Sequence, residues 1–270
     1  PLEQLRDEIT QRDEQSLHPL ERTHLPDEVA PLADALNALL IRLDAALGAQ
    51  RRFIADAAHE LRTPLTAVSL QAQMVRRSLD PAERDEALDM LESGVRRAAH
   101  LVSQLLQMAR LEPGARPEFS QVQPADLARK AVAQFAPQAE ARQIDLGLVE
   151  ASPDALSAHA PSLAALLDNL IDNALRYCPA GAHVDVAVYR TEKSLEIRVT
   201  DTGPGIPAAQ QETAFARFSR LDSREPAGSG LGLAIVREIA RLHGGEAKLE
   251  ETPGGGLTVR VRLPMPADSA

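Results

Sequence analysis

Two long helices are predicted by apolar positions that alternate steps of three and four along the first part of the chain. The first series is Ile54, Ala58, Leu61, Leu65, Val68, Ala72, Val75 and Leu79, and the second is Leu88, Leu91, Val95, Ala98, Val102, Leu105 and Ala109. This spacing forms a coiled-coil seam, and the second helix should end where Pro113 and Gly114 follow. Because two helices of one chain cannot bury both seams alone, we expect a homodimeric four-helix bundle.

A shorter helical pattern precedes the first seam. One amphipathic helix begins near Leu2, and a second runs from Val29 to Leu43, with a polar connector between them. The apolar phase of this second helix does not match that of Ile54, because four residues are in effect inserted between them. Such a stutter locally unwinds a coiled coil, so we interpret residues 43–54 as a joint between two helical modules.

From about Ala115 onward, apolar residues alternate with polar ones in three segments. They lie at 184–188, 195–199 and 257–263, and helical patterns occupy 125–142, 161–177 and 231–243. An alternation of period two with one apolar face indicates an antiparallel sheet covered on one side by helices. The sequence therefore predicts an all-α helical hairpin followed by an α/β two-layer sandwich.

The composition limits the classes of function. A chain of 270 residues suits two or three domains. A net charge of -10 argues against a nucleic-acid partner, because such a protein needs a basic face. The single cysteine, Cys178, excludes an intramolecular disulfide. No apolar run is long enough to predict a membrane span.

One histidine on the first predicted helix is a candidate for chemistry. If Ile54 occupies heptad position d, then His59, Glu60 and Thr63 face away from the seam. Thr63 lies one turn from His59, and Pro64 removes the helical hydrogen bond to the Glu60 carbonyl. A neutral imidazole offers a lone pair. Exposed histidines without such neighbours, such as His18 and His100, are expected to have no role.

Two asparagines and an aspartate indicate a nucleotide. Asn169 and Asn173 are four residues apart on one predicted helix face, where amide oxygens can reach a hydrated Mg²⁺. Asp201 follows a predicted strand, and its carboxylate can accept a hydrogen bond from an exocyclic amine. Gly203 and Gly205 after it allow close backbone approach. Taken singly, helix capping or an ordinary turn explains each motif as well.

A glycine-rich segment opens the last predicted helix. Gly228, Gly230 and Gly232 surround Ser229 and Leu231, and a helix N-terminus attracts phosphate through its unpaired N–H groups and its dipole. The motif is weak alone. It gains weight because it follows the asparagine and aspartate motifs in the same domain.

Several segments together resemble a known family. Residues 53–65 resemble the phosphoacceptor box of bacterial two-component sensor histidine kinases. The later motifs resemble the N, G1, F and G2 boxes of the Bergerat ATP-binding fold, which these kinases share with type II topoisomerases, Hsp90 chaperones and MutL proteins. The first segment resembles a HAMP signal-relay module. The resemblance implies a HAMP-like relay over 1–46, a dimerisation and phosphotransfer domain over 47–113, and a catalytic ATP-binding domain over 114–270.

The resemblance also implies a reaction, with ATP and Mg²⁺ as cofactors. His59 would take the γ-phosphate of ATP and pass it to an aspartate of a response regulator receiver domain. Glu60 would accept the proton of the other ring nitrogen, and Thr63 would position water in a reverse, phosphatase reaction. The full-length protein would be tethered to the inner membrane, with this part in the cytoplasm.

Roles in nucleotide binding follow from the same resemblance. Asn173 is expected to be the main Mg²⁺ ligand, assisted by Asn169, and Asp201 to read the adenine amine. Tyr177 would flank the base, and Arg176 and Arg220 would approach phosphate. The remaining contacts would come from the glycine motifs, through Gly203, Gly205, Gly228, Gly230, Leu231 and Gly232.

One position favours phosphotransfer over hydrolysis. ATP-hydrolysing members of the superfamily carry a glutamate four residues before the metal-binding asparagine, whereas this chain has Asn169 there. An amide cannot take a proton from water, so His59 is the preferred acceptor. Two alternatives stay open at this point: a catalytically silent dimeric scaffold that binds nucleotide as a signal, and an enzyme that is predominantly a phosphatase. The stimulus and the partner regulator are not encoded in recognisable motifs.

Overall fold

The computed structural model describes residues 30–77, 80–111, 117–219 and 228–265. The chain divides into two units, Pro1–Thr66 and Ala67–Ala270. The elements are α2 (Ala30–Arg77), α3 (Pro81–Arg110), β1 (Ser120–Val122), α4 (Pro124–Ala141), β2 (Asp145–Ala151), β3 (Leu156–Ala158), α5 (Ala160–Tyr177), β4 (His183–Arg190), β5 (Ser194–Asp201), α6 (Ala208–Ala214), α7 (Gly232–Leu242), β6 (Glu246–Glu251) and β7 (Leu257–Pro264). The predicted helix near Leu2, the connector after it, and Leu79, Pro113, Gly114 and Arg220 lie outside the described residues.

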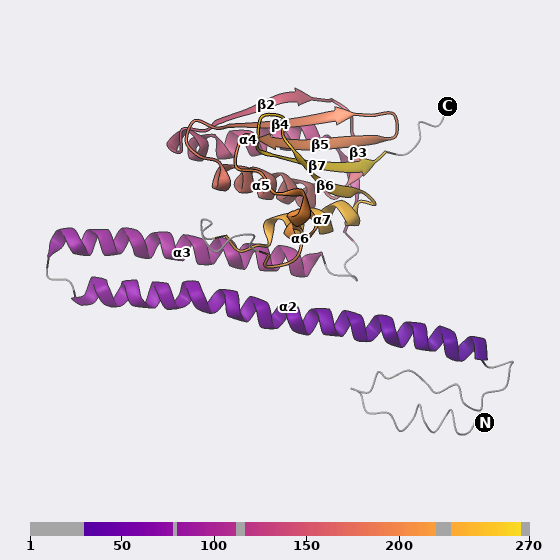
Figure 1. Ribbon diagram of the computed structural model, residues 1–270, viewed down its shortest axis with the longest axis horizontal. Helices are drawn as coiled ribbons and strands as arrows, with labels where there is room; N and C mark the ends of the chain where they lie inside the picture. Colours follow the sequence, from indigo (N-terminus) through magenta and orange to yellow (C-terminus); the bar gives the residue numbers. More distant parts are fainter. Residues whose placement is uncertain (1–29, 78–79, 112–116, 220–227, 266–270) are drawn as a thin grey trace, which may run out of the picture. The chain divides into compact units, whose positions relative to one another are not determined.

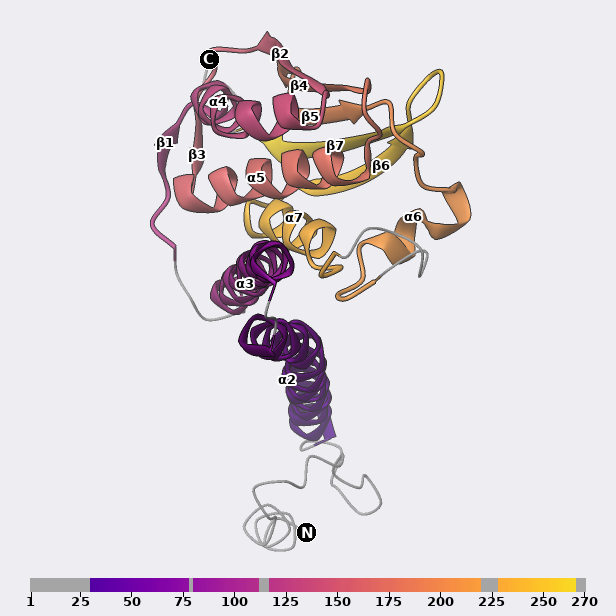
Figure 2. The same cartoon turned by 90° about the vertical axis from the view of Figure 1, so that its left-hand side faces the viewer.

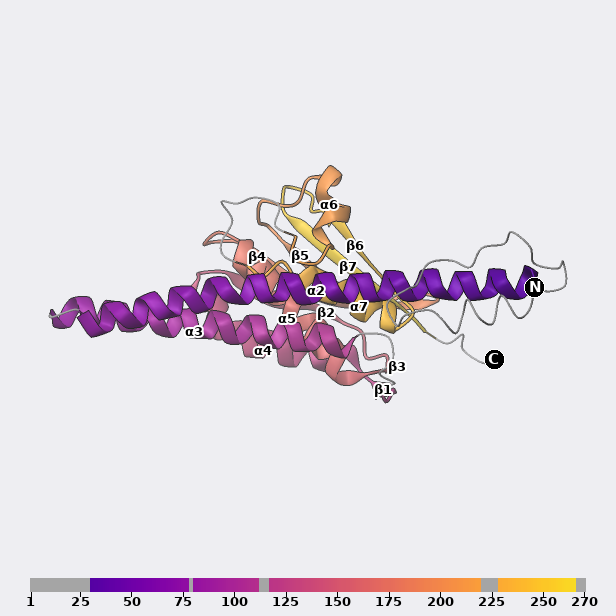
Figure 3. The same cartoon turned by 90° about the horizontal axis from the view of Figure 1, so that it is seen from below.

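Helix α2 is uninterrupted from Ala30 to Arg77, although Pro64 lies inside it (Figure 3). It contains the predicted joint at 43–54 and the predicted boundary after residue 46, so no break in helical structure marks either. The division into three domains stays a prediction. On this helix His59 is exposed, and the seam residues Ile54 and Leu65 are 59% and 55% exposed in the single chain.

Helix α3 begins at a capped end and buries a face next to its predicted seam. The Asp80 side chain accepts a hydrogen bond from the Ala82 N–H at 2.9 Å, and Pro81 opens the helix. The buried side is formed by Ala87, Gly94, Leu101, Gln104 and Met108. By contrast, the seam residues Val95 and Val102 remain 50% and 43% exposed, so most of the predicted seam has no cover within one chain.

The five-stranded sheet has the order β2-β4-β5-β7-β6. The predicted strands pair antiparallel, as expected, but β2 pairs parallel with β4. The expectation of a wholly antiparallel sheet was therefore wrong. Helix α5 lies in the connection between β2 and β4, and a helical crossover returns the chain in the same direction. Strands β1 and β3 form a separate antiparallel ribbon.

Helices α4, α5 and α7 lie on one face of this sheet (Figures 1 and 2). Alternate strand residues, among them Val186, Ile197 and Val261, are fully buried. On the other face, Glu196 is 4% exposed and forms an ion pair with Arg198 at 2.5 Å. The α/β two-layer sandwich is confirmed, with an apolar side under the helices and a charged side opposite.

A buried histidine joins three parts of the α/β domain. At the end of α7, the His243 ring accepts a hydrogen bond from the His159 N–H at 3.1 Å through Nε2, and its Nδ1 lies 2.7 Å from the Ile239 carbonyl oxygen. The ring also lies 5.1 Å from the Phe119 ring. Only a neutral imidazole protonated at Nδ1 satisfies both hydrogen bonds. Burial lowers the pKa of His243 below its usual value.

We expect this histidine to make the fold sensitive to acid. Because the unfolded chain binds this proton more readily, the free energy of unfolding should fall as the pH drops below about 6.5 toward the lowered pKa of folded His243. One such group changes that free energy by at most about 1.4 kcal/mol per pH unit. Calorimetric unfolding between pH 7 and pH 5 should show a smaller pH slope for His243→Gln than for the wild type. Equal slopes would remove His243 as the cause.

Candidate nucleotide-binding site

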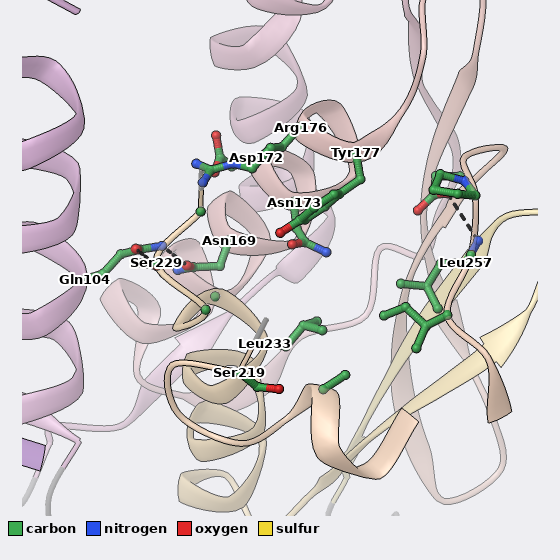
Figure 4. A pocket seen from close by; sticks show the side chains of 18 residues that line it. Gln104, Asn169, Asp172, Asn173, Arg176, Tyr177, Ser219, Ser229, Leu233 and Leu257 are labelled. Atoms are coloured by element: carbon green, nitrogen blue, oxygen red, sulfur yellow. Dashed lines mark hydrogen bonds and ion pairs between the residues drawn. The ribbon is translucent and has the colours of Figure 1, made fainter. Parts of the chain in front are cut away.

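One face of α5 supplies much of a pocket in the α/β domain. Asn169, Asn173 and Tyr177 are spaced by four residues, so they share a face of the helix. All three line the pocket, together with Asp172 and Arg176. Figure 4 shows Asn169, Asn173 and Tyr177 on this helix, around the hollow that the pocket residues surround.

Asp201 ends β5, in the wall of the same pocket. Its Oδ1 accepts hydrogen bonds from the Gly203 N–H at 2.8 Å and the Leu257 N–H at 3.2 Å, and the residue is only 7% exposed. Burial raises the pKa of this carboxyl above its usual value, and the two N–H groups and the Cys178 thiol partly offset that rise. The backbone thus fixes one carboxylate oxygen and leaves Oδ2 as the candidate acceptor for a ligand.

Close backbone packing supports the loop after Asp201. Gly205 has a φ of 71°, and a Cβ there would lie 2.7 Å from the Gly256 carbonyl oxygen. A Cβ at Gly256 would in turn lie 2.0 Å from the carbonyl oxygen of Asp201. Only glycine fits at both positions. These contacts hold the aspartate and its loop against the hairpin between β6 and β7.

The glycine-rich segment before α7 closes another side of the pocket. Gly230 has a φ of 67°, and a Cβ there would lie 2.6 Å from the Phe218 carbonyl carbon. A Cβ at Gly228 would lie 3.0 Å from Arg176 Nη1 and 3.2 Å from the Tyr177 hydroxyl. Helix α7 begins at Gly232, one residue after the predicted start at 231. The N-terminus of α7 and the end of α5 therefore meet at the pocket.

The two ends of the pocket differ in chemistry. At one end the Asp201 carboxyl accepts a hydrogen bond from the Leu257 N–H, and the apolar side chains that line the pocket are those of Ile206, Ala214, Leu233 and Leu257. In Figure 4, Leu257 lies far from Gln104 and Ser229, which mark the polar end. A purine base with an exocyclic amine suits the first end, and phosphates suit the helix N-terminus and arginine at the second.

The donors fit a metal held mainly by nucleotide phosphates. Asn173 offers an amide oxygen in the pocket. Among the described residues, no group of three or more His, Cys, Asp or Glu side chains is arranged to hold a metal ion. Mg²⁺ typically keeps several waters and takes one or two protein oxygens together with substrate phosphates. The pocket fits that mode of binding.

A glutamine that the sequence analysis did not single out also lines the pocket. Gln104, on α3, is 5% exposed, and its Nε2 donates to Asn169 Oδ1 at 3.1 Å. The Ser229 hydroxyl donates to Gln104 Oε1 at 2.6 Å. Nothing local in the sequence distinguishes this residue, because its partners lie 65 and 125 residues further along the chain.

Two contacts of the Asp172 carboxylate were also not expected. Arg176 forms an ion pair with Asp172 at 2.8 Å. His100 Nε2 lies 3.8 Å from the same Asp172 carboxylate. His100 is exposed, as expected, and it lies beside a carboxylate of the pocket wall. That it has no role stays a prediction.

The structure brings most of the predicted binding residues together. Those that line the pocket are Asn169, Asn173, Arg176, Tyr177, Asp201, Gly205, Gly228, Gly230 and Gly232. Gly203 contributes through its bond to Asp201, and Leu231 is a buried residue at the start of α7. His59, Glu60 and Thr63 belong to the other unit of the chain.

Comparison with known families identifies the chain. Residues 158–267 match the "Histidine kinase-, DNA gyrase B-, and HSP90-like ATPase" family. Residues 49–114 match the "His Kinase A (phospho-acceptor) domain" family, and residues 1–45 match the "Sensor protein PhoQ-like, HAMP domain" family. The chain belongs to the two-component sensor histidine kinases. Its α/β domain has the ATP-binding fold of that family, as the sequence predicted.

Individual relatives agree with this assignment. The sensor protein kinase PmrB of Pseudomonas aeruginosa is 39% identical over 267 residues, which cover 98% of this chain and 56% of PmrB. The sensor protein QseC of Escherichia coli K12 is 38% identical over 264 residues, covering 97% of this chain and 58% of QseC. The structure of full-length ShkA in complex with AMPPNP has a TM-score of 0.58 and 26% identity, and covers 82% of this chain and 47% of ShkA.

The chain thus spans somewhat more than half the length of the curated sensor kinases that it matches. None of the helices in the described ranges combines the length and the apolar character of a membrane-spanning segment.

Proposed function

We propose that this sensor histidine kinase region transfers the γ-phosphoryl group of ATP to His59, and that the phosphoryl group then passes to an aspartate of a response regulator. The observation that carries the proposal is the pocket itself. It gathers residues from α5, the end of β5 and the start of α7, whose sequence motifs resemble the N, G1 and G2 boxes of the family's ATP-binding fold. The ShkA structure, in complex with AMPPNP, supports a nucleotide in this fold.

Each end of the pocket has a distinct task in this proposal. Asp201 Oδ2 would accept a hydrogen bond from the adenine amine, while the apolar side chains around it exclude water. Asn173 would bind Mg²⁺ through its amide oxygen, and Arg176 and the N-terminus of α7 would orient the phosphates. The metal supplies charge neutralisation at the phosphate oxygens when it is bound.

His59 is proposed as the nucleophile, supported by its exposure on α2 and by its place in the phosphoacceptor match. Its Nε2 would attack the γ-phosphorus while the bond to the β–γ bridging oxygen breaks, and ADP leaves. The proton on the other ring nitrogen would pass to Glu60, which adjoins His59 and is partly exposed. Thr63, exposed one turn away, would position water for dephosphorylation of the regulator.

A homodimer is the assembly that we propose. The exposed seam residues of α2 and α3 form apolar surface that a second copy of the hairpin would cover, and sensor kinases with this phosphoacceptor domain are typically dimeric. The HAMP match and the two relatives also support a cytoplasmic region of a membrane-tethered receptor.

Labelled ATP tests the proposed reaction. Incubation with Mg²⁺ and γ-labelled ATP should label the protein, whereas α-labelled ATP should not, because only the terminal phosphoryl group is transferred. The label should be lost in acid and retained in base, as expected for a phosphoramidate. A base-labile, acid-stable label would contradict histidine as the acceptor. Nucleotide binding with no label at all would favour the silent scaffold.

A further inference from the structure

Gln104 connects α3 to the two polar motifs of the nucleotide pocket. It is the point at which α3 enters the pocket wall, between Asn169 on α5 and Ser229 before α7 (Figure 4). Its neighbours on the same side of the helix, Leu101 and Met108, are buried. Helix α3 packs beside α7 (Figure 2). The glutamine is therefore held in the site by a packed helix.

The direction of each hydrogen bond between Asn169, Gln104 and Ser229 follows from the contact that Asn169 makes with a backbone carbonyl. Asn169 Nδ2 donates to the Ala165 carbonyl oxygen at 2.7 Å, and a carbonyl can only accept. Asn169 Oδ1 must then face Gln104 and accept from its Nε2. Gln104 Oε1 is left as the acceptor for the Ser229 hydroxyl. Asn169, Gln104 and the Ser229 hydroxyl each have a hydrogen-bond partner in this arrangement, as buried polar groups usually do.

These hydrogen bonds disfavour the binding of a cation by Asn169 Oδ1. The Gln104 N–H that points at Asn169 Oδ1 carries partial positive charge, and it occupies one of the two lone pairs through which this oxygen could bind a metal. The same glutamine also holds the Ser229 hydroxyl, within the segment that is expected to contact phosphate. Both effects act at the polar end of the pocket and leave the Asp201 end unchanged.

We propose that Gln104 is an autoinhibitory latch. While α3 lies against the ATP-binding domain, the Gln104 amide engages Asn169 and Ser229 and weakens binding of the metal–nucleotide complex, so full binding requires α3 to move away. The proposal rests on the proposed function of this pocket. It adds a residue of the phosphoacceptor region to the control of the ATP site.

Helix α3 offers a matched control. Gln107 Oε1 accepts a hydrogen bond from Asn169 Nδ2 at 3.3 Å, so it contacts the same asparagine through the nitrogen. Gln107 does not line the pocket, and its removal leaves both Asn169 Oδ1 and Ser229 bonded to Gln104. The Gln104→Ala variant therefore releases Asn169 Oδ1 and the Ser229 hydroxyl, whereas Gln107→Ala releases neither.

The test measures nucleotide affinity directly. Fluorescence titration with methylanthraniloyl-labelled AMPPNP should show about tenfold tighter binding in Mg²⁺ for Gln104→Ala than for the wild type, since one or two net hydrogen bonds oppose the metal complex. In EDTA the gain should be smaller, because only the release of the Ser229 hydroxyl then acts, and Gln107→Ala should match the wild type in both buffers. Gln104→Met, which keeps the side-chain volume, should reproduce the gain if the alanine variant folds poorly.

Two results would overturn the latch while leaving the proposed function intact. One is equal Mg²⁺-dependent affinity in the wild type and both Gln104 variants. The other is weaker binding by those variants, which would make Gln104 a supporting residue of the site. Failure of the wild type and of every variant to bind the labelled nucleotide would contradict the proposed function itself, so the two failures are distinguishable.

Discussion

Replacement of His59 by glutamine should abolish phosphorylation of the protein by ATP. Glutamine retains a polar side chain on the exposed side of α2 but has no ring nitrogen to attack phosphorus. The expected loss is at least about a thousandfold, since no covalent step can start without its nucleophile. Affinity for the nucleotide should stay at the wild-type value, because His59 does not line the pocket. Labelled ATP and a parallel binding titration measure the two quantities.

The matched control for this variant is His183→Gln. His183 is an exposed histidine on β4, outside the pocket, so its replacement should leave the labelling intact. Loss of label in both variants would indicate misfolding rather than loss of the acceptor. Continued labelling of the His59 variant would place the acceptor elsewhere in the chain.

Replacement of Asp201 by asparagine should raise the dissociation constant for the nucleotide by roughly ten- to a hundredfold. One hydrogen bond to a charged acceptor contributes about that much to affinity. An amide nitrogen at the position of Oδ2 would face the adenine amine with a second donor. Stability should not fall, because burial already disfavours the charged carboxylate, as its raised pKa shows. The amide oxygen can keep the bonds from the Gly203 and Leu257 N–H groups. Fluorescent nucleotide titration and thermal unfolding together test this separation of binding from stability.

Asp185→Asn is the control for that substitution. Asp185 is exposed on β4 and outside the pocket, so the same change of charge there should affect neither quantity. If the Asp201 variant binds nucleotide as tightly as the Asp185 variant, adenine is not read by Asp201. If the Asp201 variant is unfolded, the Asp201 carboxylate is needed for the stability of the fold.

The motifs that were correctly placed by sequence depend on local geometry. Asn169 and Asn173 share a helix face because of the helical period, and Gly232 begins α7 because the glycine-rich segment precedes an apolar helix. Asp201 ends a strand whose alternation of apolar residues was clear. In each case a few neighbouring residues carry the information, and tertiary contacts do not override it.

The features that the sequence did not reveal depend on distant contacts. Gln104 has the appearance of a helix surface residue, and only the packing of α3 beside α7 carries it into the pocket. Strand β6 was missed because its residues are mostly charged, as expected for an edge strand with one solvated face. The parallel pairing of β2 follows from the path of the chain through α5, which alternation within a strand does not encode.

The phosphoryl group delivered from this pocket should be bound to one imidazole of α2. Tandem mass spectrometry of the protein after reaction with Mg²⁺ and ATP, with digestion kept at neutral to basic pH, tests it most directly. We expect a phosphorylated peptide whose fragments place the group on His59. A phosphoryl group on a serine, a threonine or another histidine of a fully active sample would contradict it.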